Sequence, residues 1–281
     1  MMAALGRRKA KTQAHRSAAR IAAAATAVGL AAGLAACGAG DGDSDGDGED
    51  GDGDERTLTV FAAASLQKPF EAIAERFEED NPGVDVVLSF DGSQSLVDQL
   101  GAGAPADVLA TADARTMARA EDAGTVRVPQ EFATNTLTLI VPAGNPAGVT
   151  GLDSSLDGAK LVVCAPEVPC GAATEQLETN AGVELTPVSE ESKVSDVRGK
   201  VESGQADAGI VYRTDAAAAG DRVEAIDIAG ADEVVNAYPI AVTADAGADG
   251  QRFADAETWI RAVTSDWGRK ILADAGFGAP R

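Results

Sequence analysis

Hydroxyl side chains stand at the ends of several predicted strands of this 281-residue chain, where helices are predicted to begin. Ser65 follows a β-prone segment at 57–61 and three alanines, and Tyr212 ends another strand at 208–212. The unpaired N–H groups and the dipole of a helix N-terminus favour an anion. Hydroxyls beside such N–H groups could therefore form an uncharged hydrogen-bonding cage for a small oxyanion.

Ser65 taken alone supports a simpler interpretation. A serine between a strand and a helix is usually the helix N-cap, whose oxygen accepts from first-turn N–H groups. The helical pattern after it is clear, with Phe70, Ile73 and Phe77 on one face. Whether Ser65 caps a helix or binds a ligand therefore depends on what the other strand ends carry.

The segments that must position these hydroxyls alternate between strand and helix. Strands are predicted at 57–61, 84–90, 107–110, 136–141, 161–164, 208–212, 223–228 and 237–242, and helices at 66–79, 93–100, 114–123, 171–180, 194–203, 252–263 and 267–275. This alternation predicts an α/β protein with mostly parallel sheets flanked by helices. Because the apolar strands are short, two lobes fit better than one wide sheet. Ligands in such sheets bind beyond the carboxyl ends of the strands.

Other strand ends carry the same kind of group as Ser65. The segment 91–95, Asp-Gly-Ser-Gln-Ser, follows the second strand, and 168–171, Val-Pro-Cys-Gly, opens a helix after the strand at 161–164. A further helix begins near 195–198. Each of these segments alone is explained by a cap or a turn. Together they predict several hydroxyls and free N–H groups around one small oxyanion.

The first 56 residues are not predicted to belong to this fold. Residues 1–36 combine basic residues without acids and a short apolar run, as a secretory signal peptide does. Leu-Ala-Ala-Cys at 34–37 resembles the lipobox of bacterial lipoproteins, which implies cleavage before Cys37 and lipid on Cys37; an ordinary secreted protein is the alternative. The Gly- and Asp-rich segment within 37–56 is predicted to be a disordered, solvated tether.

The charge and cysteine content exclude several functions. A formal net charge of −22, without a basic patch, argues against nucleic-acid binding. Outside the cytoplasm, the two remaining cysteines, Cys164 and Cys170, are predicted to form a disulfide. A single histidine, His15 in the signal region, leaves no Ser-His pair for a hydrolase and no zinc site. A serine-lysine pair of Ser65 with Lys68 or Lys160 remains as an alternative.

Five segments in this order resemble the molybdate-binding proteins of ABC importers. They are Val-Phe-Ala-Ala-Ala-Ser-Leu at 60–66, Gly-Ala-Pro-Ala-Asp-Val at 103–108, Val-Pro-Cys-Gly at 168–171, Asp-Val-Arg-Gly at 196–199 and Gly-Ile-Val-Tyr at 209–212. The resemblance extends from about residue 57 to 277. It implies a two-lobed fold of the type II periplasmic-binding-protein kind, with a ligand cleft between the lobes. Residues 57–137 and 239–281 would form lobe 1, and residues 138–238 lobe 2.

The resemblance also implies which residues hold the ligand. Ser65 and Ser93 match two serines that bind the anion, and Tyr212 matches a tyrosine that completes the cage. Cys170 and Val197 fall where the family offers backbone N–H groups. Ser95 is the alternative to Ser93, because the loop departs from the family pattern.

The implied function is an extracytoplasmic receptor anchored to the cell membrane by its N-terminal lipid. It binds molybdate, or tungstate, and delivers it to an ABC permease; a receptor for another tetrahedral oxyanion such as sulfate is the alternative. We expect a monomer with no cofactor, no metal site apart from the oxyanion, and no enzymatic activity. A surface adhesion or scaffold lipoprotein is a weaker alternative, because few aromatic residues are available for a large interface (4%).

Overall fold

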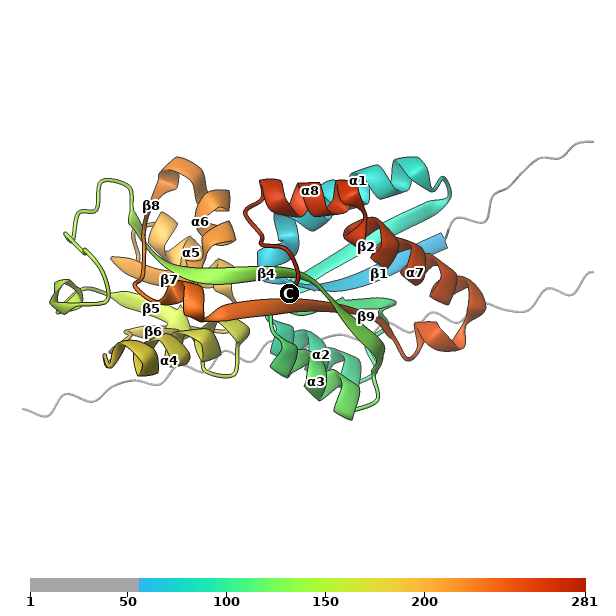
Figure 1. Ribbon diagram of the computed structural model, residues 1–281, viewed down its shortest axis with the longest axis horizontal. Helices are drawn as coiled ribbons and strands as arrows, with labels where there is room; N and C mark the ends of the chain where they lie inside the picture. The colour runs from blue at the N-terminus through green and yellow to red at the C-terminus, as the bar shows by residue number, and fades with distance from the viewer. Residues whose placement is uncertain (1–55) are drawn as a thin grey trace, which may run out of the picture. The chain divides into compact units, whose positions relative to one another are not determined.

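The computed structural model describes residues 56–281. The predicted signal peptide, Cys37 and the predicted tether up to residue 55 lie outside the described residues. Within the described range, nine strands join in one sheet in the order β2-β1-β3-β9-β4-β7-β5-β6, and β8 also pairs with β4 (Figure 1). The strands are β1 (Arg56–Ala63), β2 (Val84–Asp91), β3 (Val108–Ala110), β4 (Val126–Pro142), β5 (Leu161–Cys164), β6 (Ser189–Glu191), β7 (Ala208–Tyr212), β8 (Val223–Ile226) and β9 (Val235–Thr243). The α-helices are α1 (Gln67–Asp80), α2 (Ser93–Gly101), α3 (Ala114–Asp122), α4 (Pro169–Ala181), α5 (Val194–Glu202), α6 (Arg213–Ala219), α7 (Gly250–Thr264) and α8 (Asp266–Asp274).

The first lobe is built around β1. Strands β2, β1 and β3 run parallel, and β9 and the first part of β4 complete this part of the sheet in antiparallel pairing. Helices α1, α7 and α8 cover one face, and α2 and α3 cover the other (Figure 1). The chain leaves β1 through a short 3-10 turn, Ala64–Leu66, which carries Ser65.

The second lobe is built around β5, which pairs in parallel with β6 and β7. The end of β4 pairs antiparallel with β7 and with β8. Helices α5 and α6 lie on one side of this part of the sheet, and α4 lies on the other (Figure 1). The α/β class and the two lobes agree with the expectation from the sequence, but one sheet runs through both lobes instead of a separate sheet in each.

Two long strands, β4 and β9, connect the lobes. Strand β4 pairs with β9 from Val126 to Thr136 and with β7 from Leu137 onward. Strand β9 begins at Val235, opposite Thr136. Because these two strands pair antiparallel with their neighbours, the sheet is mixed, and only the β1–β3 and β5–β7 parts are parallel as predicted. The lobe boundaries at 137/138 and 238/239 stay a prediction.

Three α-helical or β-strand segments have no counterpart in the sequence-based prediction. The first part of β4 contains Pro129 and a positive φ of 44° at Val128, and its pairing with β9 shifts register between Arg127 and Gln130. Such irregularity removes the alternation by which a strand is recognised. Strand β6 has only three residues, and α6 is a seven-residue helix that follows directly on β7.

An aromatic cluster fixes α1 in place. Trp259 of α7 is fully buried and meets Phe70 and Phe77 of α1 edge to face, with ring centroids 5.6 and 5.4 Å apart. Edge-to-face contact adds to the free energy gained by burying the rings. Phe70 and Phe77 lie on the predicted apolar face of this helix. Because α1 is held against α7, the turn that carries Ser65 at the start of α1 is held as well.

Candidate functional site

A small pocket lies between the two lobes. Its lining residues are Ala63, Ala64, Ser65, Asp91, Ser93 and Ala112 of the first lobe and Val168, Pro169, Cys170, Val194 and Tyr212 of the second. The pocket is small, with a volume of about 10 Å³. A pocket of this size excludes an extended organic ligand.

The helices that begin at this pocket have no side-chain cap. The N-cap residues of α2, α4, α5 and α6 make no side-chain hydrogen bond to the first turn. By contrast, α3, α7 and α8, whose first residues do not line the pocket, are capped by aspartate or serine side chains. The first-turn N–H groups at the pocket are therefore left for a ligand.

Ser65 is not a helix cap. Its hydroxyl pairs with the hydroxyl of Tyr238 at 3.0 Å, and neither the 3-10 turn nor α1 has a side-chain cap. The simpler interpretation of Ser65 is therefore wrong. Its side chain borders the pocket instead, at the carboxyl end of β1.

Ser93 is buried at the first position of α2. Its oxygen accepts a hydrogen bond from the Ala112 N–H at 3.0 Å. The hydroxyl has one hydrogen, which this contact does not use, so Ser93 can still donate to a ligand. Ser95, the alternative in the same segment, is half-buried and does not line the pocket.

Tyr212 ends β7 and is fully buried at the pocket. The side-chain amide of Asn236 donates to its oxygen at 3.0 Å. Burial, followed by the charges of neighbouring groups, raises the pKa of Tyr212 well above its usual value. The phenol is therefore neutral and keeps its hydrogen at physiological pH, as a donor must.

Cys170 lines the pocket from the first turn of α4. A disulfide joins it to Cys164 at the end of β5. The next residue, Gly171, lies so close to the loop before it that a Cβ there would stand 2.5 Å from the carbonyl carbon of Ala165. The disulfide and this close approach hold the start of α4, with its N–H groups, against the end of β5.

Val197 does not line the pocket, and Val194 does. Val197 is the fourth residue of α5, and the N–H at that position bonds the carbonyl of the N-cap, Lys193, inside the helix. The N–H of the first residue, Val194, has no such partner. Val194 is therefore the residue at the start of α5 that borders the pocket, and Val197 as a ligand donor stays a prediction.

Uncharged groups dominate the pocket. Its lining residues include no Lys or Arg, and Asp91 is the one charged residue among them. The Asp91 Oδ1 accepts from the Gly92 N–H at 2.8 Å and lies 3.9 Å from the Lys193 ammonium of the other lobe. Sequence analysis did not single out Asp91 or Ala112. The pocket can therefore hold an anion through hydroxyl and backbone donors, without a salt bridge.

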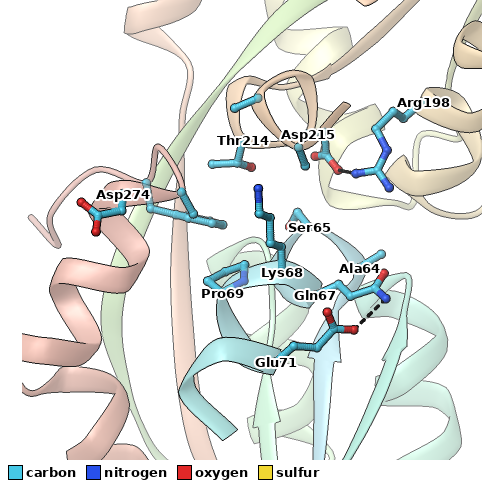
Figure 2. Close-up of a pocket in the computed structure, with 14 residues that line it drawn as sticks. Ala64, Ser65, Gln67, Lys68, Pro69, Glu71, Arg198, Thr214, Asp215 and Asp274 are labelled. Atoms are coloured by element: carbon cyan, nitrogen blue, oxygen red, sulfur yellow. Dashed lines mark hydrogen bonds and ion pairs between the residues drawn. The ribbon is translucent and has the colours of Figure 1, made fainter. Parts of the chain in front are cut away.

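A larger cavity opens on the α1 side of Ser65, with a volume of about 290 Å³. It is lined by the start of α1 in the first lobe and by Arg198, Thr214 and Asp215 of the second. Figure 2 shows the Lys68 side chain in this cavity, with its ammonium directed toward Thr214. Ser65 borders both this cavity and the small pocket, so the cavity extends the space between the lobes beyond the pocket.

Asp215 gives the stability a predictable pH dependence. Burial raises the pKa of Asp215 from 3.8 to about 7, although Arg198 and the backbone of Tyr212 oppose the shift. The folded state therefore binds this proton more tightly than the unfolded state does. This contribution to stability is complete below pH 3.8 and is lost as the pH rises toward 7, by at most about 1.4 kcal/mol per pH unit.

The substitution Asp215→Asn is expected to remove this slope, which urea unfolding at a series of pH values would measure. Asp227→Asn is the matched control, because Asp227 is exposed and also pairs with an arginine. The control should keep the slope of the wild-type protein. If Asp215→Asn keeps the same change of unfolding free energy with pH, the raised pKa of Asp215 is contradicted.

Two features are missing from residues 56–281. None of the helices in this range combines the length and the apolar character needed to cross a membrane. Within the same residues, no group of three or more His, Cys, Asp or Glu side chains could hold a metal ion.

The chain resembles known solute-binding proteins in sequence and in structure. It matches the family described as bacterial extracellular solute-binding protein over residues 58–278. The molybdate-binding protein ModA of Mycobacterium tuberculosis is 44% identical over 227 residues, which cover 80% of this chain and 85% of that protein. The periplasmic molybdate-binding protein of Azotobacter vinelandii has a TM-score of 0.68 at 21% identity, covering 80% of this chain and 100% of that one. The sulfate-binding protein SubI of Mycobacterium tuberculosis has a TM-score of 0.62 at 22% identity, covering 79% of this chain and 86% of that one.

Proposed function

Because the chain belongs to the family of bacterial extracellular solute-binding proteins, we propose that it is the molybdate receptor of an ABC importer. Its two-lobed fold is that of type II periplasmic binding proteins, as the sequence predicted. The relative at 44% identity is a molybdate-binding protein. The observation that carries the proposal is the pocket itself, where uncapped helix starts and three hydroxyls converge and no Lys or Arg lines the wall.

The proposed ligand set follows the pocket lining. The hydroxyls of Ser65, Ser93 and Tyr212 and the backbone N–H groups of Cys170 and Val194 donate to the oxygens of one tetrahedral dianion. Hydrogen bonds to a charged group are stronger than neutral ones, so several such donors offset the lost hydration of the anion. Molybdate and tungstate share this shape and charge, and either can act as ligand. The closed protein then docks on the permease.

Closure of the lobes depends on contacts at Gly92. The Gln94 side chain of the first lobe donates to the Ser192 carbonyl of the second at 2.8 Å, and a Cβ at Gly92 would overlap that same carbonyl oxygen. Gly92→Ala is therefore expected to penalise the closed form by roughly 1–3 kcal/mol. We expect a molybdate affinity about 5- to 150-fold weaker in a calorimetric titration, with an unchanged melting temperature of the ligand-free protein.

Gly101→Ala in the same helix, where a Cβ would have no neighbour within 4 Å, is the control and should bind like the wild-type protein. If Gly92→Ala binds molybdate as tightly as the wild-type protein, the lobes need not approach each other at Gly92 as closely as they do in this structure.

A receptor for sulfate is the second candidate. The sulfate-binding protein SubI shares the fold, and sulfate is also a tetrahedral dianion. A cage of uncharged donors discriminates between such anions by the spacing of its donors, since their charge is the same. The 44% identity to a molybdate-binding protein favours molybdate.

We also propose that the protein is not an enzyme. Ser65 has Tyr238, and not a general base, as its hydroxyl partner. A serine nucleophile requires an adjacent base, and His15 lies outside the described residues. The same proposal includes the signal peptide at 1–36, the lipid on Cys37, the tether, the monomeric state and the lobe boundaries.

The test is the metal that the purified protein carries. Protein from cells grown with molybdate is expected to contain close to one molybdenum per chain by elemental mass spectrometry. Growth with tungstate instead of molybdate should replace molybdenum with tungsten. Protein without either element that instead carries stoichiometric sulfate would favour the second candidate.

A further inference from the structure

The side chain of Arg115 reaches from the first lobe to the second. Arg115 is the second residue of α3, and its Nη2 donates to the carbonyl oxygens of Pro166 and Glu167 at 3.4 and 3.1 Å. These two residues lie between β5 and α4 of the second lobe. In Figure 1, α3 and α4 lie on the same, lower side of the sheet. Because the contact joins the two lobes, it is lost whenever they move apart.

The position of Arg115 within α3 is not explained by the stability of the helix. A positive charge in the first turn is opposed by the helix dipole, which favours cations in the last turn. Arg119, in the last turn of the same helix, has that favourable position and pairs with Asp98 of its own lobe at 2.8 Å. The Nε of Arg115 lies 3.5 Å from the carboxylate of Asp113, the N-cap residue. This ion pair orients the guanidinium, whose other edge faces the second lobe.

The segment that accepts from Arg115 is closed by the disulfide between Cys164 and Cys170, and we call the segment between these two cysteines the disulfide loop. Within it, the Val168 N–H donates to the Ala165 carbonyl at 2.9 Å and forms a β-turn with a proline and a glutamate at its centre. This turn uses the carbonyl of its first residue, so the carbonyls of its two central residues can accept from Arg115. The last three residues of the disulfide loop line the pocket.

We propose that Arg115 is a positioning residue that holds the closed lobes together by binding the disulfide loop, and that it thereby slows the release of the bound oxyanion. This inference rests on the proposed function of the pocket. Arg115 does not line the pocket, so it acts on the ligand through the contact between the lobes. The guanidinium bonds the loop in the closed form and water in an open one, and the contact therefore favours the form that encloses the ligand.

This role predicts an effect on one rate constant and not on the other. The ligand enters while the lobes are apart, before Arg115 meets the loop, so loss of the contact should leave the association rate unchanged. Release requires the lobes to separate, so loss of the contact should make release faster. An arginine that attracted the anion from solution would instead change the association rate. The two rate constants therefore distinguish a contact between the lobes from simple attraction of the anion.

The experiment is stopped-flow measurement of molybdate association and release by protein fluorescence, with excess tungstate displacing molybdate in the release arm. Arg115→Gln is expected to release molybdate roughly 3- to 10-fold faster, the effect of losing an exposed hydrogen-bonded contact. Its association rate should stay within about 2-fold of the wild-type value. The dissociation constant from calorimetric titration should rise by the same factor as the release rate. The melting temperature of the ligand-free protein should not change.

Two single variants separate geometry from charge. Arg119→Gln is the matched control, because it removes an arginine from the same helix whose partner, Asp98, lies in the same lobe. It should bind and release molybdate at the wild-type rates. Arg115→Lys keeps the positive charge, but its single nitrogen cannot contact both Asp113 and the disulfide loop as the planar guanidinium does. It should release molybdate faster than the wild-type protein.

The disulfide loop is tested through its cross-link, because backbone carbonyls cannot be removed by substitution. Replacing both Cys164 and Cys170 with serine frees the loop and is itself expected to weaken molybdate binding. In this background Arg115→Gln should change the release rate by less than about 2-fold, because the carbonyls that it meets are no longer held in place. If the serine variant does not fold, as judged by its melting curve, Pro166→Gly loosens the same turn with the disulfide intact and takes its place.

A wild-type release rate in Arg115→Gln, or equally fast release in Arg119→Gln, would overturn the role of Arg115 while leaving the proposed function standing. Slower association with unchanged release in Arg115→Gln would overturn it too, in favour of attraction of the anion. An equal effect of Arg115→Gln with and without the disulfide would overturn the part assigned to the disulfide loop. If the wild-type protein binds sulfate but not molybdate, the proposed ligand is wrong, and the same rates with sulfate decide the role of Arg115. A wild-type protein that binds neither anion overturns both proposals.

Discussion

Replacing Gly171 with alanine is expected to destabilise the protein by about 4 kcal/mol or more and to abolish molybdate binding. Gly171 lies in the first turn of α4, and a Cβ there would stand 2.5 Å from the carbonyl carbon of Ala165 and 2.7 Å from the Cys164 carbonyl oxygen. These neighbours are backbone atoms, and a disulfide ties the same loop to α4. The loop cannot yield without moving the Cys170 N–H away from the ligand. Urea unfolding and calorimetric titration measure the two effects.

Gly199→Ala provides the control for this substitution. Gly199 lies inside α5, where an added Cβ would meet no atom within 4 Å. Alanine is the better helix former, so this variant should be more stable than the wild-type protein by up to about 1 kcal/mol. If Gly171→Ala and Gly199→Ala have the same stability and the same molybdate affinity, the close approach at Gly171 does not constrain the loop.

The double substitution of Ser93 by alanine and Tyr212 by phenylalanine is expected to weaken molybdate binding at least 100-fold. Each change removes one hydroxyl donor to the dianion, and such a hydrogen bond contributes about 1.5–3 kcal/mol. Two of them correspond to roughly 10²- to 10⁴-fold in the dissociation constant. The Ser93 change also leaves the buried Ala112 N–H without its partner, so some loss of stability should accompany the loss of affinity. Calorimetric titration and a melting curve separate these effects.

Ser95→Ala tests the choice between the two serines of this segment. Ser95 does not line the pocket, so this variant should bind molybdate within about 3-fold of the wild-type protein. A large loss in Ser95→Ala with none in Ser93→Ala would reverse the assignment of the second serine.

Local sequence patterns were enough to predict the α/β class, the two lobes and most of the strand ends that border the pocket. The regular spacing of Phe70 and Phe77 predicted the buried face of α1, which packs on Trp259. Ser65, Ser93 and Tyr212 could be singled out because each follows or ends a regular strand. Such signals are strong because they depend on neighbours a few residues apart.

Features that depend on contacts distant in sequence were not predicted. Strand β4 is held by β9 and β7 despite Pro129 and an irregular register, so its first part has no local strand pattern. That Val194 borders the pocket and Val197 does not depends on where α5 begins relative to the other lobe. Asn236 reaches Tyr212 across 24 positions of the sequence and Ala112 across 124. A serine or tyrosine reveals a possible donor, but only the fold shows which groups contact its oxygen.

The central claim is that the pocket binds molybdate through uncharged donors, and calorimetric titration of the wild-type protein tests it most directly. Molybdate and sulfate are titrated into separate samples of ligand-free protein at the same ionic strength. The account predicts one molybdate per chain with a dissociation constant of about 1 μM or lower, and sulfate binding weaker by about 100-fold or more. Tight binding of sulfate, with no heat from molybdate at micromolar concentrations, would contradict it.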